Sequence, residues 1–190
     1  SESTRAEVTD VANAVLEQAD AIMLSGETTT GKYPIKCVQA LDRIAQRIER
    51  SGGLSFAAGA VLDNDREKTV RSAVVLANSL PDAKLMVFTR RGTMASYVAG
   101  QRPADAPLFA LAPTWELCRK LGLLRAVHSI FLPHESTPER TTAAAENYLL
   151  EKRLVKTGGH LIVVSDIFAG EDRFDSIQLR RAPWGGVSCA

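Results

Sequence analysis

Two short polar segments of this 190-residue chain carry the residue types that could do chemistry. The first reads Ser25-Gly26-Glu27-Thr28 and follows a short apolar run. A hydroxyl and a carboxylate joined by water can relay a proton, so Ser25 and Glu27 are candidate catalytic residues. Ser and Glu are also common in loops, and the alternative interpretation is that Ser25 caps the apolar run while Glu27 holds the loop in shape.

The second segment reads Thr89-Arg90-Arg91-Gly92-Thr93 and lies between a predicted strand and a predicted helix. Backbone N–H groups at a helix N-terminus, together with hydroxyl and guanidinium donors, suit a phosphate. This segment is therefore a candidate phosphate-binding loop. The alternative is an ordinary strand-to-helix turn, with Gly92 at a tight position and two solvated arginines.

The sequence predicts no metal site. The three histidines have no metal-ligand spacing, and neither do the cysteines, which are far apart in the chain. We expect the cysteines to be buried or incidental thiols in a reducing compartment. The residues concerned are His128, His134, His160, Cys37, Cys118 and Cys189.

The composition excludes several classes of protein. The chain is 45% apolar, 24% charged and 6% aromatic, which is typical of a globular protein. Its net charge of +1 offers no electrostatic argument for nucleic acid or an anionic membrane surface as a partner. The apolar runs are far shorter than the about 20 residues of a membrane span, and no segment resembles a signal peptide.

Residues 65–183 alternate regularly between helical and strand patterns. This alternation predicts an α/β domain in which helices cover both faces of a mostly parallel, five-stranded sheet. The last two strands are too close in sequence for a crossover helix, so the final strand is expected to be antiparallel. We expect helices near 67–80, 92–101, 114–121 and 138–155, and strands near 84–89, 107–112, 127–132, 159–165 and 176–182.

Residues 1–50 predict only a helix, a strand and a second helix. The first helix begins with a capping box between Thr4 and Glu7, the strand covers 21–24, and the second helix runs from Pro34 to about residue 50. A lone strand has nothing to pair with, so this part is expected to be a slice of a larger architecture. Residues 51–64 are predicted as a linker, and residues 184–190 as a flexible tail.

The first forty residues resemble a known family. Residues 4–15 are similar to the penultimate barrel helix of pyruvate kinase, and residues 23–28 with 31–34 are similar to its eighth barrel strand and the following loop. The rest of the chain resembles that family's C-terminal domain more loosely, through the order of elements and the Thr89 to Thr93 loop. The resemblance implies that residues 1–50 are a slice of a (β/α)8 barrel and that 65–183 are the regulatory, oligomer-forming domain.

The resemblance also implies a function for the parent protein. The family transfers a phosphoryl group from phosphoenolpyruvate to ADP in cytoplasmic glycolysis, using Mg²⁺ and usually K⁺, and its subunits form homo-oligomers. Its cation ligands and phosphate-binding side chains lie on earlier barrel strands, so this chain alone is expected to be inactive and to bind neither ion. Ser25 and Glu27 would border the active site only in an intact barrel.

In those family members that have an allosteric sugar phosphate, the loop matching Thr89 to Thr93 holds one of its phosphates, so the resemblance implies a sugar phosphate or nucleotide effector here. The second half of that pocket is a loop matching residues 169–175, where Glu171, Asp172 and Asp175 oppose a bisphosphate by like charge. A ligand with one phosphate, held by the Thr89 loop alone, remains compatible with the sequence. Arg140 is a weak further candidate for binding that phosphate. Two alternatives remain: a stand-alone, non-catalytic phosphate- or small-molecule-binding module, or residues 1–50 rearranged onto the C-terminal sheet.

Overall fold

A computed structural model of the chain describes residues 5–133, 135, 137–169 and 172–183. The chain divides into two compact units, residues 1–60 and residues 61–190. In the part of the chain that is described, no helix combines the length and the apolar character that crossing a membrane requires.

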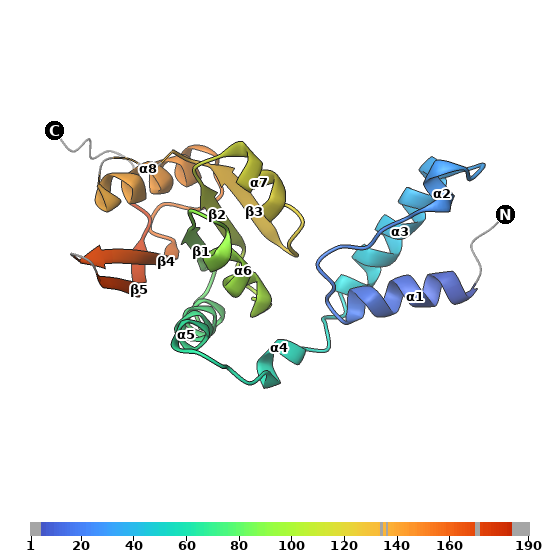
Figure 1. Cartoon of the computed structure of the whole chain (residues 1–190), viewed down its shortest axis with the longest axis horizontal. Coiled ribbons are helices and arrows are strands. Elements are labelled where there is room, and N and C mark those ends of the chain that lie inside the picture. Colours follow the sequence, from blue (N-terminus) through green and yellow to red (C-terminus); the bar gives the residue numbers. More distant parts are fainter. Residues whose placement is uncertain (1–4, 134, 136, 170–171, 184–190) are drawn as a thin grey trace. The chain divides into compact units, whose positions relative to one another are not determined.

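The first unit is helical (Figure 1). The two predicted long helices are confirmed, and α1 packs against α3. The predicted capping threonine, Thr4, lies outside the described residues. Much of the apolar side of α3 is exposed, with Ile35 at 70% and Val38 at 49%. The helices are α1 (Arg5–Leu16), α2 (Gly26–Thr29), α3 (Pro34–Glu49) and α4 (Phe56–Gly59).

The strand predicted at residues 21–24 is wrong. These residues have no regular secondary structure, although exposed Ala21 and Met23 alternate with half-buried Ile22 and Leu24 as they would in a strand. A strand is defined by hydrogen bonds to a neighbour, and the described part of this unit has no other strand to supply them. Residues 21–24 therefore have the alternating burial of a strand without its ladder of hydrogen bonds.

The predicted linker 51–64 contains the short helix α4 and ends at the first helix of the second unit, α5 (Asp65–Ser79). The side-chain oxygen of Asn64 accepts a hydrogen bond from the backbone N–H of Glu67 at 3.0 Å. In return, the Glu67 carboxylate accepts from the N–H of Asp63 at 2.7 Å. This reciprocal cap explains why the helix begins two residues before the predicted residue 67.

The second unit is built on a five-stranded sheet with the order β3-β2-β1-β4-β5 (Figure 1). The first four strands in sequence run parallel, and β5 is antiparallel to β4, as predicted. The strands are β1 (Lys84–Phe88), β2 (Leu108–Ala112), β3 (Val127–Phe131), β4 (His160–Ala169) and β5 (Asp172–Arg181). The remaining helices are α6 (Thr93–Gly100), α7 (Trp115–Leu121) and α8 (Pro138–Glu151).

Helices cover both faces of this sheet. Alternate residues of β1 enter separate apolar clusters, because successive side chains of a strand point to opposite faces. Leu85 and Val87 pack with residues of α5, α6 and α7. Met86 and Phe88 pack with Leu149 and other residues of α8. Burial on both faces accounts for the unbroken apolar runs in the strand sequences.

The thiols are distributed as buried or incidental residues would be. Cys118 on α7 is 5% exposed and belongs to the apolar cluster on that face of the sheet. Its burial raises the pKa of its thiol. Cys37 on α3 is half-buried. Cys189 lies outside the described residues.

The hairpin of β4 and β5 is longer than the sequence suggested. Their pairing continues to Ala169 and Asp172, so the segment 169–175, predicted as a loop, belongs largely to the two strands. Antiparallel strands can be joined by a very tight turn, and pairing can then run to the tip even where the residues are polar. The long helix α8 ends at Glu151, four residues before the predicted end, and Arg153 then adopts a positive φ of 55°.

An ion pair ties this hairpin to α5. The Arg66 guanidinium donates to both carboxylate oxygens of Asp175, at 2.7 Å and 2.9 Å. The side chains of Arg66 and Asp175 are 24% and 13% exposed, so the pair is partly shielded from water. Chiefly through this hydrogen bond, Asp175 raises the pKa of the Arg66 guanidinium.

We predict that Arg66→Met lowers the free energy of unfolding of the second unit by about 1–3 kcal/mol, because Asp175 keeps its burial and loses its partner. Urea unfolding followed by circular dichroism measures the change. The exposed Arg119 on α7 provides the matched control, and Arg119→Met should alter stability by less than about 0.5 kcal/mol. Equal losses in the two variants would contradict a special role for the ion pair.

Candidate functional site

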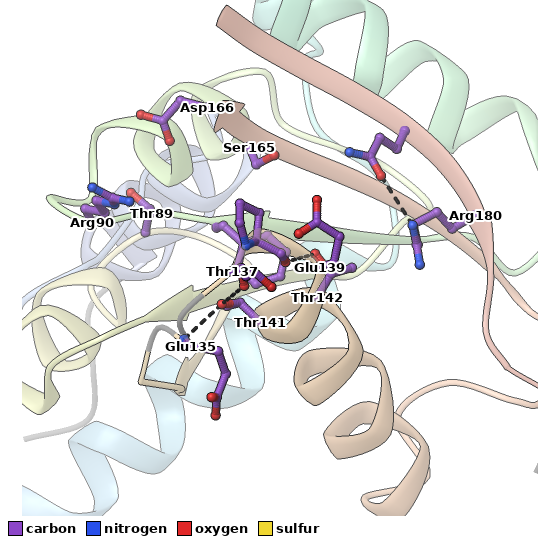
Figure 2. A pocket seen from close by; sticks show the side chains of 13 residues that line it. Thr89, Arg90, Glu135, Thr137, Glu139, Thr141, Thr142, Ser165, Asp166 and Arg180 are labelled. Carbon is purple, nitrogen blue, oxygen red and sulfur yellow. Dashed lines mark hydrogen bonds between the residues drawn. The ribbon is translucent and has the colours of Figure 1, made fainter. Parts of the chain in front are cut away.

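A cavity of about 300 Å³ lies at the carboxyl end of β1, between that strand, the start of α8 and the β4–β5 hairpin (Figure 2). Polar side chains predominate in its lining. The lining residues are Phe88, Thr89, Arg90, Glu135, Thr137, Pro138, Glu139, Thr141, Thr142, Ser165, Asp166, Gln178 and Arg180.

Thr89 connects the buried sheet to the cavity. Its backbone N–H donates to the carbonyl of Leu111 on the neighbouring strand at 3.1 Å, and its side chain is buried. The Thr89 hydroxyl oxygen accepts a hydrogen bond from the N–H of Gly92 at 3.0 Å. Thr89 therefore shapes the turn that follows β1, and its hydroxyl hydrogen remains available as a donor.

The structure brings only part of the predicted phosphate loop to the cavity. Thr89 and Arg90 line it, whereas Arg91, Gly92 and Thr93 are not among the lining residues. Arg91 and Thr93 are exposed, and Gly92 is buried at the N-cap of α6 with a φ of 91°. A Cβ atom on Gly92 would lie 3.1 Å from Cδ1 of Leu117. Gly92 thus serves the turn and the packing of α7.

The start of α8 forms the opposite wall. The Thr137 hydroxyl oxygen accepts from the N–H of Arg140 at 3.3 Å and so caps the helix. The buried Thr141 hydroxyl accepts from the N–H of Glu135 at 2.9 Å and donates to the carbonyl of Thr137 at 3.1 Å. These bonds fix the chain that enters α8. The N-terminus of this helix carries a partial positive charge that favours anions.

The third wall belongs to the hairpin. Arg180 on β5 donates to a carboxylate oxygen of Glu146 at 2.6 Å and to the Gln178 side chain at 3.4 Å. The Glu146 side chain is 8% exposed and that of Arg180 is 41% exposed, so the guanidinium supplies the counter-charge of a buried carboxylate on α8. Ser165 and Asp166 on β4 complete this wall (Figure 2).

The sequence reasoning missed most of these residues. The start of the helix predicted near 138–155 is confirmed, but no local pattern says that this helix end faces Thr89. Arg140, the weak further candidate, is exposed and is not among the lining residues. Of the three carboxylates expected near a phosphate, Asp175 is paired with Arg66 and does not line the cavity. Glu171 lies outside the described residues.

The candidate catalytic residues lie in the other unit. Ser25 and Glu27 are exposed at the start of α2, and the Glu27 carboxylate accepts a hydrogen bond from the N–H of Ser25 at 2.9 Å. A Cβ atom on Gly31 would lie 2.3 Å from the carbonyl oxygen of Glu27, so this loop depends on a glycine there. Through its hydrogen bond to Ser25, Glu27 holds the loop in shape in this arrangement, which is the role that the alternative interpretation gave to Glu27.

The described residues include no group of three or more His, Cys, Asp or Glu side chains placed to hold a metal ion. The ring of His128 lies tilted against the ring of Phe109, with centroids 5.5 Å apart, and the Nδ1 atom of His160 lies 3.2 Å from the carbonyl oxygen of Pro81. His134 lies outside the described residues.

Comparison with known proteins identifies the class to which this fold and cavity belong. The family model described as "Pyruvate kinase, barrel domain" matches residues 1–38, and "Pyruvate kinase, alpha/beta domain" matches residues 67–178. The second match alone covers more than half of the chain. The chain therefore belongs to the pyruvate kinase family.

Individual relatives agree with this assignment. Pyruvate kinase isozyme G, chloroplastic, from Ricinus communis is 39% identical over 164 residues, covering 85% of this chain and 39% of that protein. Plastidial pyruvate kinase 3, chloroplastic, from Arabidopsis thaliana is 35% identical over 189 residues, covering 96% of this chain and 33% of that protein. A crystal structure of Cryptosporidium parvum pyruvate kinase superimposes with a TM-score of 0.76 at 27% identity, covering 95% of this chain and 36% of that one.

The chain thus spans between a third and two fifths of the length of these relatives.

We predict that Gly92→Ala destabilises the second unit by about 1–2 kcal/mol, because alanine is strained at positive φ and its methyl group would press on Leu117. Gly100→Ala at the end of α6 is the matched control. A Cβ atom there meets open space, so stability should change by less than about 0.5 kcal/mol. Urea unfolding measures both variants, and an unchanged midpoint for Gly92→Ala would contradict the argument.

Proposed function

We propose that this chain is the C-terminal part of a pyruvate kinase subunit, whose parent enzyme transfers phosphate from phosphoenolpyruvate to ADP in glycolysis. The observation that carries the proposal is that two matches of different kinds occur in one chain: barrel sequence in residues 1–38 and the α/β domain in residues 67–178. A stand-alone binding module would have no need of the barrel segment. In this proposal the part played by the chain is effector binding and subunit contact.

The catalytic machinery of the parent lies mostly outside these residues. Mg²⁺ and K⁺ belong to the proposed parent reaction, and the described residues include no group of three or more His, Cys, Asp or Glu side chains placed to hold a metal ion. In an intact barrel, Ser25 and Glu27 would border the active site, and Ser25 would be associated with the water network that protonates the enolate. Their position just after residues 21–24 fits the catalytic end of a barrel.

Subunit contact is supported by the outer edge of the sheet. Among the described residues, β5 pairs only with β4, which leaves one side of a ten-residue strand without a partner. Leu179 and Phe174 on this strand are each 53% exposed. A long, partly apolar edge is a template for pairing with a second copy, and closed symmetric dimers are the commonest assemblies. We therefore propose a homo-oligomer.

We propose that the cytoplasm is the site of action, because the family resemblance implies cytoplasmic glycolysis and free thiols such as Cys37 and Cys118 are typical of a reducing compartment. Two of the similar plant proteins are named chloroplastic. Imaging of a fluorescently tagged full-length protein distinguishes the two compartments.

The proposed effector site is the cavity at the carboxyl end of β1. Thr89 offers a hydroxyl and Arg90 a guanidinium, which are phosphate-binding donors, and the N-terminus of α8 faces the same space. A volume of about 300 Å³ is at the small end of the range for ligand pockets. The effector in this proposal is a phosphorylated small molecule, of the sugar phosphate or nucleotide type.

We predict that the 190-residue chain shows no turnover with phosphoenolpyruvate, ADP, Mg²⁺ and K⁺ in an assay coupled to lactate dehydrogenase. The reason is that one barrel segment cannot assemble an active-site face. A complete pyruvate kinase added to the same mixture is the positive control. Pyruvate formation that rises in proportion to the concentration of this chain would contradict the expectation.

We predict that millimolar ribose 5-phosphate raises the melting temperature of the chain by about 3 °C or more, because a ligand that binds only the folded state stabilises it. Arg90→Met should abolish most of that rise. Arg91→Met is the matched control: it is the next residue, it is exposed, and it does not line the cavity. If Arg91→Met has the larger effect, the phosphate binds outside the cavity.

A further inference from the structure

Positively charged side chains gather at the amino end of the sheet, opposite the end that bears the cavity. Lys84 begins β1, and Arg181 ends β5, which runs antiparallel to β4 and therefore finishes at this same end. Lys152, Arg153 and Lys156 lie in the connection that leaves α8 and enters β4. These five residues are called the basic surface.

The register of the strands brings the two ends of the basic surface close together. Lys84 is paired with Leu161 on β4, and the preceding residue of that strand is paired with Arg181 on β5. Because neighbouring strands lie about 4.8 Å apart, the backbones of Lys84 and Arg181 are separated by about 10 Å. Side chains as long as those of Lys and Arg can therefore act on one bound segment.

The turn that carries Lys156 is tied to the strand that carries Arg181. The N–H of Gly158 donates to the carbonyl of Ala182, and the N–H of Ala182 donates to the carbonyl of Gly159, both at 2.9 Å. The Arg181 guanidinium also donates to the carbonyl of Gly158 at 3.1 Å. A guanidinium has five N–H donors, so others remain for a partner. The basic surface is thus held in place without a ligand.

Most of this positive charge faces water. Four of the five side chains are exposed, and that of Lys156 reaches 87%. The exception is Lys84, which is 14% exposed and lies 2.8 Å from a carboxylate oxygen of Asp82. The other oxygen of Asp82 lies 3.6 Å from Nζ of Lys156. Asp82 and, at the end of α8, Glu151 offset two of the positive charges and leave the surface basic.

Arg153 occupies a backbone position that suits glycine. Its φ is 55°, in the left-handed region that is unfavourable for a residue with a Cβ atom. A cation just after a helix is favoured by the helix dipole, which accounts for a charge at this position. The dipole does not account for Lys156 and Arg181, which lie outside the helices. The positive charge at this end of the sheet therefore exceeds what the fold requires.

We propose that the basic surface binds an acidic, extended segment of a partner protein. Arg153 and Arg181 can each hold a carboxylate through two parallel hydrogen bonds. In an extended segment, alternate side chains lie on one side about 7 Å apart, so two or three carboxylates cover the width of the surface. This surface and the cavity lie at opposite ends of the sheet, so the inference is independent of the proposed effector site.

The surface suits a protein segment better than nucleic acid or a bilayer. A DNA-binding protein commonly neutralises about six to ten phosphates, more than four exposed cations can reach. Bases also stack on exposed aromatic side chains. In the described part of the second unit, Trp115 and Phe174 are such side chains, and both lie at the other end of the sheet. The net charge of +1 gives the whole chain no general attraction to an anionic bilayer.

Fluorescence anisotropy with a labelled peptide of about ten residues, in which Glu alternates with Ser, tests the proposal on the 190-residue chain. The comparison peptide has Gln in place of Glu. In about 50 mM NaCl the chain should bind the Glu peptide about tenfold more tightly than the Gln peptide, and about 300 mM NaCl should remove most of that preference.

Two variants separate binding from folding. The triple variant with Lys152→Gln, Lys156→Gln and Arg181→Gln should bind the Glu peptide about tenfold more weakly, with an unchanged circular dichroism spectrum. Arg153→Gly should weaken binding about threefold without lowering the melting temperature, because glycine adopts a positive φ readily. Arg140→Gln is the matched control, since Arg140 is exposed at the opposite end of α8, and it should keep the native affinity within twofold.

The inference is overturned if the native chain does not prefer the Glu peptide, or if the triple variant binds that peptide as tightly as the native chain does. It is also overturned if a DNA duplex or phosphatidylserine vesicles bind the native chain more tightly than the peptide and lose that binding in the triple variant. The basic surface would then serve a different class of partner.

Discussion

Burial of the central strands on both faces is the constraint on which the second unit depends. A strand covered by helices on both sides can continue into a parallel neighbour only through a crossover, so the carboxyl ends of β1 to β4 meet at one edge. The turn after β1 and the chain entering α8 both arise at that edge. The cavity at Thr89 is a consequence of this topology, as is usual for ligand sites in open α/β sheets.

The reversal at β5 gives the cavity its third wall. The β4–β5 hairpin is held from both faces of the sheet: Arg66 of α5 binds Asp175 on one face, and Glu146 of α8 binds Arg180 on the other. The two β5 residues are five apart, and an odd spacing places their side chains on opposite faces of a strand. Ion pairs from two helical layers therefore help to hold the hairpin in place.

Charge in this protein is organised locally, and the net charge of the chain does not reveal the charges at individual sites. The chain is nearly neutral, with a net charge of +1, yet one cavity has donors on its β1 wall and the carboxylates of Glu135 and Glu139 on its α8 wall. Arg180 shows how a charge near a site can be committed elsewhere, because its guanidinium serves the buried Glu146. A count of arginines around the cavity would overstate its affinity for anions.

Much of the fold could be predicted from the sequence, because the signals are local. The helices and strands of residues 65–183 follow from periodicity and caps, and the short connection before β5 dictates its antiparallel direction. The strand at 21–24 could not be judged this way, since strand formation depends on hydrogen bonds from a distant partner. Thr89 and Arg90 were predicted as candidate phosphate donors from the sequence alone. Only the tertiary structure decided that they face the start of α8 and the β4–β5 hairpin. It also decided that Arg66 pairs with Asp175, which is 109 residues away in the sequence. Both contacts depend on how the strands are ordered in the sheet, which no local pattern specifies.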